Sequence, residues 1–548
     1  MSRRALTEDT GSPVGAIAPP SELSAALKDP RCYPHAVGRV KLIETHISWV
    51  YLAGNYAYKL KKPVNLGFLD FSTLRARRHY CAEELRLNRR TAADLYLEVV
   101  PVGGTANAPR IGAGGPAIDY ALKMRRFPQE AMADRLAARG ELGPAQIDAM
   151  AAVIAGFHAA IPAAPARSAF GSARGVAALA LRNFDAIQAL VSDPEDRERL
   201  ETLRAWTRSE AARSREAFSA RRRGGCVREC HGDLHLRNIV FLDGRPVPFD
   251  CIEFSAELRW IDVMSEVAFL AMDLLDHRLD AAAWRLLNAY LEATGDYAGL
   301  SVLRFYLVYR AMVRAKIACI RAQQTRDSVG GRPSLKREYR GYLTLGESLV
   351  RPRQPFLVLM HGLSGSGKTT VSQGLLERTG GVRLRSDVER KRLHGLAPRS
   401  HSGSGTQAGL YAPAATRKTY ERLRQLARGI VESGWPALVD ATFLSRSERG
   451  AFAALARELG VPFVIVSCNA PESELRHRVA SRQSANSDAS EAGLAILEHQ
   501  LATQEPPHEE ERACMAVLDT ADAAALEQAI DGIAARLLFS AGPGRSCA

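Results

Sequence analysis

Residues 362–369 of the chain read GLSGSGKT, which fits the phosphate-binding loop pattern G-x-x-x-x-G-K-S/T at every fixed position. Glycines in such a loop let consecutive backbone N–H groups turn toward phosphate oxygens. Lys368 can reach the β- and γ-phosphates of a nucleotide, and the hydroxyl of Thr369 can bind Mg²⁺. The spacing predicts a nucleotide site made by Gly362, Ser364, Gly365, Ser366, Gly367, Lys368, Thr369 and Thr370.

A second set of chemically capable residues lies in the first half of the chain, where the stretch HGDLHLRN is followed by FD. Phosphoryl transfer to a hydroxyl needs a carboxylate near the hydroxyl proton, and the Mg²⁺ that accompanies ATP needs hard oxygen ligands. Asp233, Asn238 and Asp250 supply three such oxygens in order. An Asp-Gly turn at 243–244 between two apolar runs predicts a hairpin, which would bring Asn238 and Asp250 close together.

A strand with two lysines and a helix with two glutamates precede these residues. The pattern predicts two strands joined by a turn, then a helix whose N-cap is Ser72. Lys59 and Lys61 lie on the same side of the second strand, and the helix carries Glu83 and Glu84. In a protein kinase fold, a strand lysine paired with a glutamate of the next helix positions the α- and β-phosphates of ATP. Because Lys and Glu are more often solvated, this pairing alone is weak evidence.

The remainder of the first half predicts a sheet-rich lobe followed by a helical one. Further strands are expected over 95–102 and 118–126, and the break at Phe127-Pro128 suits a hinge between lobes. The chain after this break is mostly helical in pattern. Three carboxylates there lie at helical spacing and are expected to form a solvated face: Asp273, Asp276 and Asp280.

In the second half, apolar runs alternate with helical stretches. Strands are predicted over 356–360, 382–386, 437–442, 463–468 and 516–518. This alternation favours a parallel sheet that binds its ligands at the carboxyl ends of the strands. Two strands end in acids there: Asp387 follows the second strand and Asp440 ends the third. Asp440 could hold the water shell of Mg²⁺, with Thr442 beside the acceptor.

The stretch HGDLHLRN with the later FD resembles the aminoglycoside phosphotransferase family, a branch of the protein-kinase-like fold. The resemblance implies that Asp233 orients or deprotonates the acceptor hydroxyl while Asn238 and Asp250 bind Mg²⁺. It also implies that His231 is a structural residue of this loop and that Asp262 supports the loop from beneath.

By the same resemblance, Lys59 is expected to be the lysine that binds ATP and Glu84 its partner. Lys61 and Glu83 are alternatives that the sequence leaves open. The chain departs from the kinase pattern in one respect: no G-x-G-x-x-G precedes the lysine strand, and Gly54 alone stands in the turn before it.

Residues 386–390, SDVER, and the arginines near residue 480 are similar to parts of the small-substrate kinases among P-loop proteins, such as polynucleotide, zeta-toxin-type and gluconate-type kinases. This similarity implies that Asp387 is the base and that Arg390 binds the acceptor. It makes Arg478 and Arg482 the arginines of a lid, where positive charge can stabilise the transferring phosphoryl group.

Bulk properties agree with two catalytic domains. The chain has 548 residues, of which 46% are hydrophobic and 24% charged, which is typical of a globular protein with more than one domain. A net charge of +13 suits anionic ligands, including nucleic acid, although the arginines are expected to lie mostly on solvated helix faces. Nine scattered cysteines, no apolar leader and no membrane-spanning run predict a cytoplasmic protein that does not bind membranes.

The sequence thus predicts an α+β protein-kinase-like (aminoglycoside phosphotransferase) domain over residues 21–350 and an α/β P-loop kinase domain with a mainly parallel sheet over 351–541, after a flexible arm at 1–20. The predicted reaction is ATP- and Mg²⁺-dependent phosphoryl transfer to a hydroxyl of a small molecule. Two alternatives remain: a polynucleotide 5′-hydroxyl kinase activity in the second domain, and a non-catalytic regulator that senses ATP.

Overall fold

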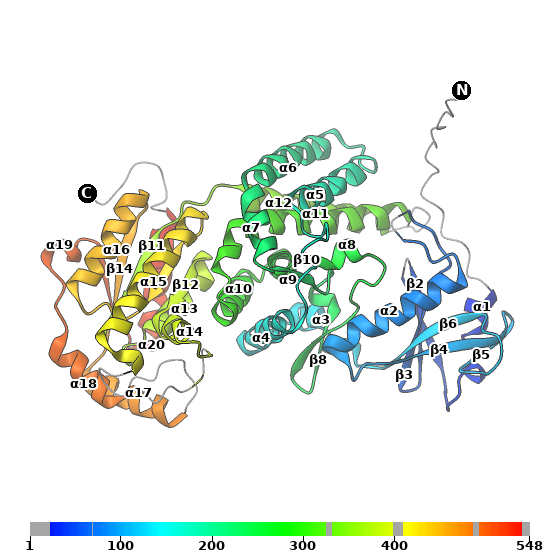
Figure 1. The fold of residues 1–548 in the computed structure, drawn as a ribbon, viewed down its shortest axis with the longest axis horizontal. Helices are drawn as coiled ribbons and strands as arrows, with labels where there is room; N and C mark the ends of the chain where they lie inside the picture. The colour runs from blue at the N-terminus through cyan, green and yellow to red at the C-terminus, as the bar shows by residue number, and fades with distance from the viewer. Residues whose placement is uncertain are drawn as a thin grey trace.

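The computed structural model describes residues 22–45, 47–67, 69–324, 331–397, 400, 409–485 and 493–539. The arm predicted over residues 1–20 lies outside the described residues. Figure 1 shows an elongated molecule, with a sheet-rich lobe at one end, a helical lobe in the middle and an α/β unit at the other end. The chain passes through these three parts in that order.

The sheet-rich lobe is built on a six-stranded sheet in the order β1-β2-β3-β6-β4-β5, in which neighbouring strands are antiparallel. Helix α2 packs against this sheet and carries the predicted glutamates. The elements are α1 (Glu22–Ala26), η1 (Pro30–Cys32), β1 (Val40–Glu44), β2 (Ser48–Ala53), β3 (Tyr56–Lys61), α2 (Leu74–Ala92), β4 (Tyr96–Thr105), β5 (Ala108–Ile111) and β6 (Asp119–Arg125).

The N-cap of α2 is Thr73, so the prediction of Ser72 is wrong by one residue. The Thr73 hydroxyl accepts a hydrogen bond from the N–H of Ala76 at 3.1 Å. Ser72 is held instead by Asp70, whose carboxylate accepts hydrogen bonds from the backbone N–H and the hydroxyl of Ser72. This local turn competes with the cap and leaves the helix to begin after Thr73.

The helical lobe surrounds a buried helix, α9, which is apolar except for a few residues. Two short two-stranded sheets, β7 with β10 and β8 with β9, complete this lobe. The elements are η2 (Gln129–Ala131), α3 (Ala133–Ala138), α4 (Pro144–Ala160), α5 (Ala173–Gln188), α6 (Pro194–Arg213), α7 (Arg215–Arg223), β7 (Val227–Glu229), η3 (Leu236–Asn238), β8 (Ile239–Leu242), β9 (Arg245–Pro248), α8 (Ala256–Arg259), β10 (Trp260–Asp262), α9 (Val263–Asp276), α10 (Asp280–Thr294), η4 (Tyr297–Gly299), α11 (Leu300–Gln324) and α12 (Gly331–Val350).

The α/β unit has a five-stranded parallel sheet in the order β12-β13-β11-β14-β15. Parallel strands place the loops that follow them on one edge of the sheet, where ligands bind. The elements are β11 (Leu357–His361), α13 (Lys368–Thr379), β12 (Val382–Arg385), α14 (Ser386–Leu393), η5 (Gly409–Tyr411), α15 (Pro413–Glu432), β13 (Ala437–Asp440), α16 (Arg446–Leu459), β14 (Phe463–Asn469), α17 (Glu472–Ala485), α18 (Leu494–Thr503), α19 (Glu509–Arg512), β15 (Met515–Asp519) and α20 (Ala523–Phe539).

The predicted fold class is confirmed, since a kinase-like α+β domain precedes an α/β domain with a parallel sheet. The predicted hairpin around Asp243-Gly244 is present as β8 and β9, with φ angles of 48° and 75° at the two turn residues. The boundary proposed at residue 351 stays a prediction, and it falls between the end of α12 and the start of β11.

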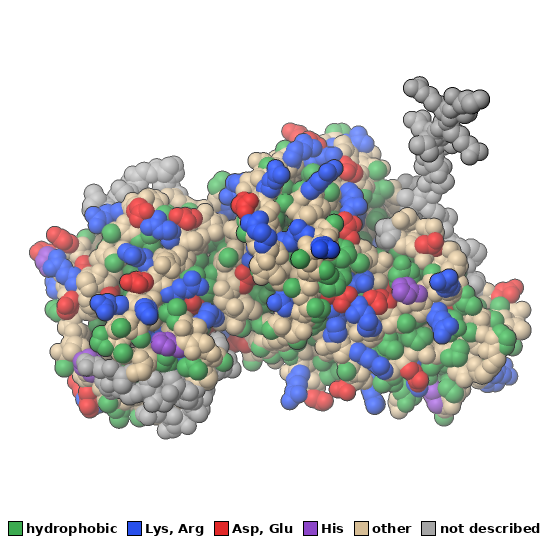
Figure 2. Space-filling model, in the orientation of Figure 1, with side chains coloured by type: hydrophobic (Ala, Val, Ile, Leu, Met, Phe, Trp, Pro, Cys, Tyr) green, Lys and Arg blue, Asp and Glu red, His purple; other side chains and the backbone are tan. Residues whose placement is uncertain are grey.

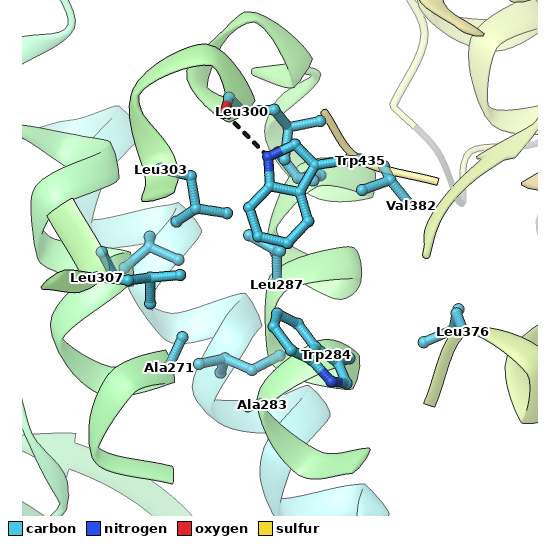
Figure 3. Close-up of a cluster of buried hydrophobic side chains, with 14 of the residues drawn as sticks. Ala271, Ala283, Trp284, Leu287, Leu300, Leu303, Leu307, Leu376, Val382 and Trp435 are labelled. Atoms are coloured by element: carbon cyan, nitrogen blue, oxygen red, sulfur yellow. Dashed lines mark hydrogen bonds between the residues drawn. The ribbon is translucent and has the colours of Figure 1, made fainter. Parts of the chain in front are cut away.

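The two domains share one continuous hydrophobic core. Trp435 of the second domain is 2% exposed, and its indole Nε1 donates to the carbonyl oxygen of Leu300 in the first domain at 3.1 Å. Its ring lies 6.0 Å from that of Trp284 on α10, at 64°. Figure 3 shows this cluster, in which residues of both domains meet: Trp284, Leu287, Leu300, Leu303, Leu376, Val382 and Trp435. The domains are therefore docked on one another over an apolar contact.

The surface carries both signs of charge. On the face drawn in Figure 2, Lys and Arg side chains are interspersed with Asp and Glu over the helices. Many charged side chains of the described residues are ion-paired, including Arg204 with Asp185 and Arg199 with Glu347. Among the described helices, none combines the length and the apolar character needed to cross a bilayer.

Candidate active sites

The two lysines of β3 share one glutamate. Lys59 Nζ donates to Glu84 Oε1 at 2.7 Å and also binds the carboxylate of Asp250. Lys61 Nζ binds the other oxygen of Glu84 and, in addition, Glu253. The Lys61 side chain is 1% exposed and the Lys59 side chain 12% exposed. Lys59 is thus the lysine that reaches the predicted metal-binding carboxylate.

In this network two lysines face three carboxylates, those of Glu84, Asp250 and Glu253. Burial would lower the pKa of Lys59 and Lys61, but the surrounding carboxylates outweigh it and raise both pKa values, so both lysines stay charged. The alternative glutamate, Glu83, points elsewhere and pairs with Arg86 at 2.6 Å and Arg259 at 3.0 Å.

The loop over residues 231–238, which the sequence predicts to be the catalytic loop, is fixed by its own side chains. His231 Nδ1 accepts from the N–H of Asp233 at 3.3 Å, so its Nε2 donates to the carbonyl oxygen of Phe249 at 2.8 Å. Burial lowers the pKa of His231, which keeps the imidazole neutral for these two bonds. His231 therefore connects the Asp233 side of the site to the Asp250 side, as a structural residue.

Three oxygen-bearing side chains meet at this loop. The amide nitrogen of Asn238 donates to the backbone oxygen of Asp233 at 2.9 Å and to its Oδ2 at 3.1 Å. The hairpin returns the chain so that the N–H of Phe249 donates to the backbone oxygen of Asn238 at 2.9 Å. Asp250 follows with a left-handed φ of 65°, a conformation uncommon for a residue with a side chain.

The Asp233 carboxyl is poised in its ionised form. Burial alone would raise its pKa, but His235, whose Nε2 lies 3.4 Å from Asp233 Oδ2, and Arg314 hold the pKa well below the usual range. A carboxylate that stays ionised can accept a hydrogen bond from a hydroxyl.

The support beneath the loop comes from α9. Glu266 accepts hydrogen bonds from the N–H groups of His231 at 3.0 Å and Gly232 at 2.7 Å. Asp273, two helical turns further along the same side of α9, accepts from the N–H of Leu236 at 2.9 Å. Burial would raise the pKa of Glu266, but the hydrogen bonds and charge interactions with His158 and His231 together outweigh it, and the pKa falls to about 2.

Two expectations for this region are wrong. Asp262 does not support the loop, because its carboxylate caps α9 at Met264 and binds Arg221 at 2.7 Å. Asp273 is not part of a solvated face, because it is 2% exposed and holds the loop. Gly54 stands in the turn between β2 and β3. Its turn lies against Arg126 at the hinge, beside a hollow of about 510 Å³ lined by Gly54, Asn55 and residues 125–129.

The second site is built on the loop between β11 and α13. Gly362, Gly365 and Gly367 have φ angles of 138°, 84° and 82°, which glycine adopts without strain. A Cβ on Gly362 would lie 2.4 Å from the carbonyl oxygen of Cys468, so a side chain there would displace the backbone. The loop therefore holds the N-terminus of α13 open toward an anion.

The lysine and threonine of this loop both make hydrogen bonds within the site. Lys368 Nζ donates to the carbonyl oxygen of Leu363 at 2.7 Å, and burial lowers its pKa. The Thr369 hydroxyl donates to Asp440 Oδ2 at 2.8 Å, which brings both predicted metal-binding groups together. The N–H of Ser364 donates to Oε1 of Gln500 on α18 at 2.8 Å, so a side chain occupies one of the N–H groups that would bind phosphate.

A cavity of about 500 Å³ opens on the loop. It brings together predicted residues from four segments of the chain, whereas Gly362 and Ser366 do not line it. The predicted residues in its lining are Ser364, Gly365, Gly367, Lys368, Thr369, Thr370, Asp387, Arg390, Asp440, Thr442, Arg478 and Arg482.

The arginines of this cavity differ in their contacts. Arg390 lies over the ring of Tyr411 at 5.0 Å and donates to the carbonyl oxygen of Leu410 at 2.9 Å, and its buried Nε has no partner among the described residues. Arg478 is engaged by Glu474 at 2.7 Å and by the carbonyl oxygen of Thr520 at 2.8 Å. Arg482 lines the cavity from the same helix, α17.

Several residues of both sites were not predicted. In the first site they are Glu253, Glu266 and His158, and in the second Gln500 and Glu448. Burial raises the pKa of Glu448, which lines the cavity, to about 7. Glu266 and Asp273 could have been noticed, because they are seven residues apart in an otherwise apolar helix and so share a face.

Comparisons with known proteins agree with this geometry. A model of the phosphotransferase enzyme family matches residues 69–306, and a model of an AAA domain matches residues 357–507. The chain is therefore a kinase-type phosphotransferase that acts on a hydroxyl acceptor, with a second, P-loop kinase-like domain. Kinase families of this type use ATP, generally with Mg²⁺.

Two mycobacterial proteins are similar to almost the whole chain. The chain is 30% identical over 482 residues to protein Rv2004c of Mycobacterium tuberculosis (strain ATCC 25618 / H37Rv) and to protein Mb2027c of Mycobacterium bovis (strain ATCC BAA-935 / AF2122/97). The alignment covers 87% of this chain and 93% of each relative. The chain belongs to the same protein family as these relatives.

Solved structures are similar to one domain or the other. An ethanolamine kinase of Plasmodium vivax is 10% identical, with a TM-score of 0.36, over 57% of this chain and 84% of that one. A sugar kinase of a Janibacter species is 21% identical, with a TM-score of 0.27, over 34% of this chain and 96% of that one.

Proposed function

We propose that each domain transfers the γ-phosphoryl group of ATP to a hydroxyl of its own small-molecule acceptor. In the first domain the acceptor hydroxyl would lie at Asp233, whose depressed pKa keeps it ionised and able to accept a hydrogen bond that orients the hydroxyl. Asn238, bonded to both the backbone and the carboxylate of Asp233, holds that carboxylate in place.

The residues of the first site fit Mg²⁺. The Asp250 carboxylate is 43% exposed, and Asn238 and Asp250 flank the same hairpin, which brings two residues with hard oxygen donors close together. Bound there, the metal would neutralise charge on the phosphates of ATP. Lys59, now bound to Asp250, would turn to the α- and β-phosphates while Glu84 keeps it in reach.

The residues of the second site also fit MgATP. The Thr369 hydroxyl and Asp440 lie 2.8 Å apart and offer oxygens to Mg²⁺, and Lys368 lies within the loop that would hold the phosphates. Asp387 would act as the base for the acceptor hydroxyl, and Arg390 would bind the acceptor. Arg478 and Arg482 would supply positive charge to the transferring group.

One observation carries the proposal. Lys59 and the stretch from Asp233 to Asp250 lie more than 170 residues apart in the chain, yet hydrogen bonds join them into one site between the two lobes. A structural role would not require an ionised, partly exposed carboxylate at its centre. The acceptors are proposed to be small alcohols, since fold alone names no substrate.

The test is a titration with MgADP followed by turnover of labelled ATP. The full chain should bind two equivalents of MgADP and the Lys368→Ala variant one. Asp233→Asn should lower transfer to the acceptors of a metabolite panel at least about a hundredfold while the first site still binds MgADP. If Asp233→Asn and Asp387→Asn both leave turnover unchanged while binding persists, the protein is not acting as a kinase through these residues. A 5′-hydroxyl oligonucleotide in the panel separates the nucleic-acid alternative from a small acceptor.

A further inference from the structure

Helix α10 of the first domain is the element on which the second domain sits. Its Arg285 binds Asp148 of the first domain at 2.6 Å and Glu377 of α13 at 2.9 Å. Its Asn288 and Glu292 follow on the same face, one helical turn apart each, and both contact strand β12 of the second domain. This helix therefore faces the strand that leads into the predicted acceptor helix, α14.

Asn288 takes the place of a neighbouring strand. Its amide nitrogen donates to the carbonyl oxygen of Gly381 at 3.0 Å, and its Oδ1 accepts from the N–H of Arg383 at 2.7 Å. Because β12 is the edge strand of the parallel sheet, these backbone groups face away from β13. A side chain 2% exposed thus supplies the two hydrogen bonds that a sixth strand would make, which fixes the position of β12.

Glu292 places a charge at the same point. Its Oε1 accepts from Arg383 Nε at 2.8 Å, and Arg383 Nη1 donates in turn to the carbonyl oxygen of Thr369 at 3.4 Å. Its Oε2 lies 3.9 Å from Nη1 of Arg385, which lines the cavity. Arg383 is only 6% exposed, so its charge is balanced chiefly by a carboxylate that belongs to the other domain.

The first active site holds α10 from the other side. The hydroxyl of Tyr290 lies 2.9 Å from His158 Nδ1, and His158 Nε2 lies 3.1 Å from Glu266, which binds the catalytic loop. Tyr290 and Glu292 are two residues apart on the same helix. The helix that balances Arg383 is thereby anchored in the hydrogen-bond network of the first domain.

We infer that Glu292 is a positioning residue of the second site. It orients and neutralises Arg383 beside Thr369, and it faces Arg385. The part of the P-loop cavity around Thr369, where Mg²⁺ would bind, and the lining at Arg385 therefore depend on a side chain of the first domain. The inference rests on the proposed role of the P-loop site as a MgATP site. Without the Glu292 charge, the positive charge of Arg383 beside Thr369 would oppose the binding of Mg²⁺.

Binding of Mg²⁺ tests this role without any acceptor. The full chain carrying Asp250→Asn is titrated with Mg²⁺ in the presence of a fluorescent ADP analogue, and the response assigned to the P-loop site is the part lost on adding Lys368→Ala. Glu292→Gln should raise the Mg²⁺ concentration for half-maximal response about fivefold, the effect of one unbalanced charge several ångströms away. Arg383→Gln should lower that concentration, because the Glu292 carboxylate then acts on the metal unopposed.

The matched control is Glu377→Gln, which removes an interdomain Arg–Glu pair of the same kind away from the cavity. It should leave the Mg²⁺ requirement within about twofold of the reference chain. The double variant Glu292→Gln/Arg383→Gln buries no unbalanced charge, so it should fold and return the requirement to within about twofold. If Glu292→Gln fails to fold, the other two variants still test the role of Glu292. The inference then requires that Arg383→Gln lowers the Mg²⁺ requirement and that the double variant returns it to the reference value.

The outcomes separate the two proposals. Equal Mg²⁺ requirements in Glu292→Gln, Arg383→Gln and Glu377→Gln would overturn the positioning role of Glu292. A response that Lys368→Ala does not reduce would instead contradict the MgATP site itself. Normal binding with the expected shifts, but no Lys368-dependent ATP turnover, would support the positioning role and refute catalysis by the second domain.

Discussion

The two lysines of β3 offer a sharp test, because one glutamate binds both. We expect Lys59→Met and Lys61→Met to affect different properties of the protein. Methionine keeps most of the side-chain volume and removes the charge, so packing is nearly matched between the two variants. Lys59 faces Asp250 and the space for ATP, whereas Lys61 lies between Glu84 and Glu253 with 1% of its side chain exposed.

The magnitudes follow from burial. Lys61→Met leaves Glu253, 4% exposed, without its ammonium partner, and breaking a buried ion pair costs about 3–5 kcal/mol. Protonation of Glu253, whose pKa burial already raises, would offset part of this cost. Lys59→Met leaves Glu84 bound to Lys61, and Asp250 is 43% exposed and hydrated, so the cost in stability is about 1 kcal/mol. Loss of a charged hydrogen bond to phosphate removes about 1.5–3 kcal/mol of binding, or about 10- to 150-fold in affinity.

The assay uses the chain with Lys368→Ala, so that nucleotide binds at the first site alone. Calorimetric titration with MgATP reports affinity, and urea unfolding reports stability. Lys59→Met should weaken binding with little change in the unfolding midpoint, and Lys61→Met should do the reverse. The assignment fails if Lys61→Met weakens MgATP binding about tenfold at an unchanged midpoint while Lys59→Met binds normally.

Three further predictions concern other parts of the molecule. Trp435→Ala removes a ring buried between the domains and should cost about 3–5 kcal/mol, seen in scanning calorimetry as an earlier transition; an unchanged thermogram would mean that the domains are not docked through this ring. Burial raises the pKa of Glu448 from 4.5 to about 7, so the folded state holds its proton more tightly, and stability should fall as pH rises from about 4.5 to 7, by at most about 3 kcal/mol. Glu448→Gln should abolish this decline in the urea midpoint, and a variant that keeps the full decline would show that another group titrates. Glu266→Gln weakens the hydrogen bonds that Glu266 accepts from the N–H groups of His231 and Gly232. Turnover at the first site should therefore fall about 10- to 100-fold in initial-rate assays, while the affinity for MgATP is retained. A loss of affinity without a loss of turnover would contradict a role confined to the loop.

Local chemistry made much of the first site predictable. The Asp-Gly turn at 243–244 sets the hairpin by its own φ preferences, so the proximity of Asn238 and Asp250 follows from neighbouring residues. The choice between Lys59 and Lys61 could not be made this way, because residues two apart on a strand share a face and both reach Glu84. The contacts of Asp250 and Glu253, nearly 200 residues later, distinguish them.

In the second domain, too, some features could be predicted from the sequence and others could not. The P-loop and the strand end at Asp440 could be predicted because the loop pattern and the apolar run of the strand are local features of the sequence. The docking of the domains was not, because its residues look like ordinary core: Trp284, Leu287 and Trp435 carry no signal that tells an interface from an interior. Asn288 and Glu292 read equally well as polar residues of a solvated helix, and only the position of β12 gives them a role.

Asn288 of α10 covers the edge of strand β12 with its side-chain amide, which matters when the two domains are separated. If the second domain were produced alone, the N–H of Arg383 and the carbonyl of Gly381 would be exposed on an open sheet edge, next to the uncovered ring of Trp435. Open edges beside apolar surface pair with other chains. The separate second domain should therefore self-associate by strand addition. In the full chain, the first domain covers this strand edge and the Trp435 ring and so prevents the association.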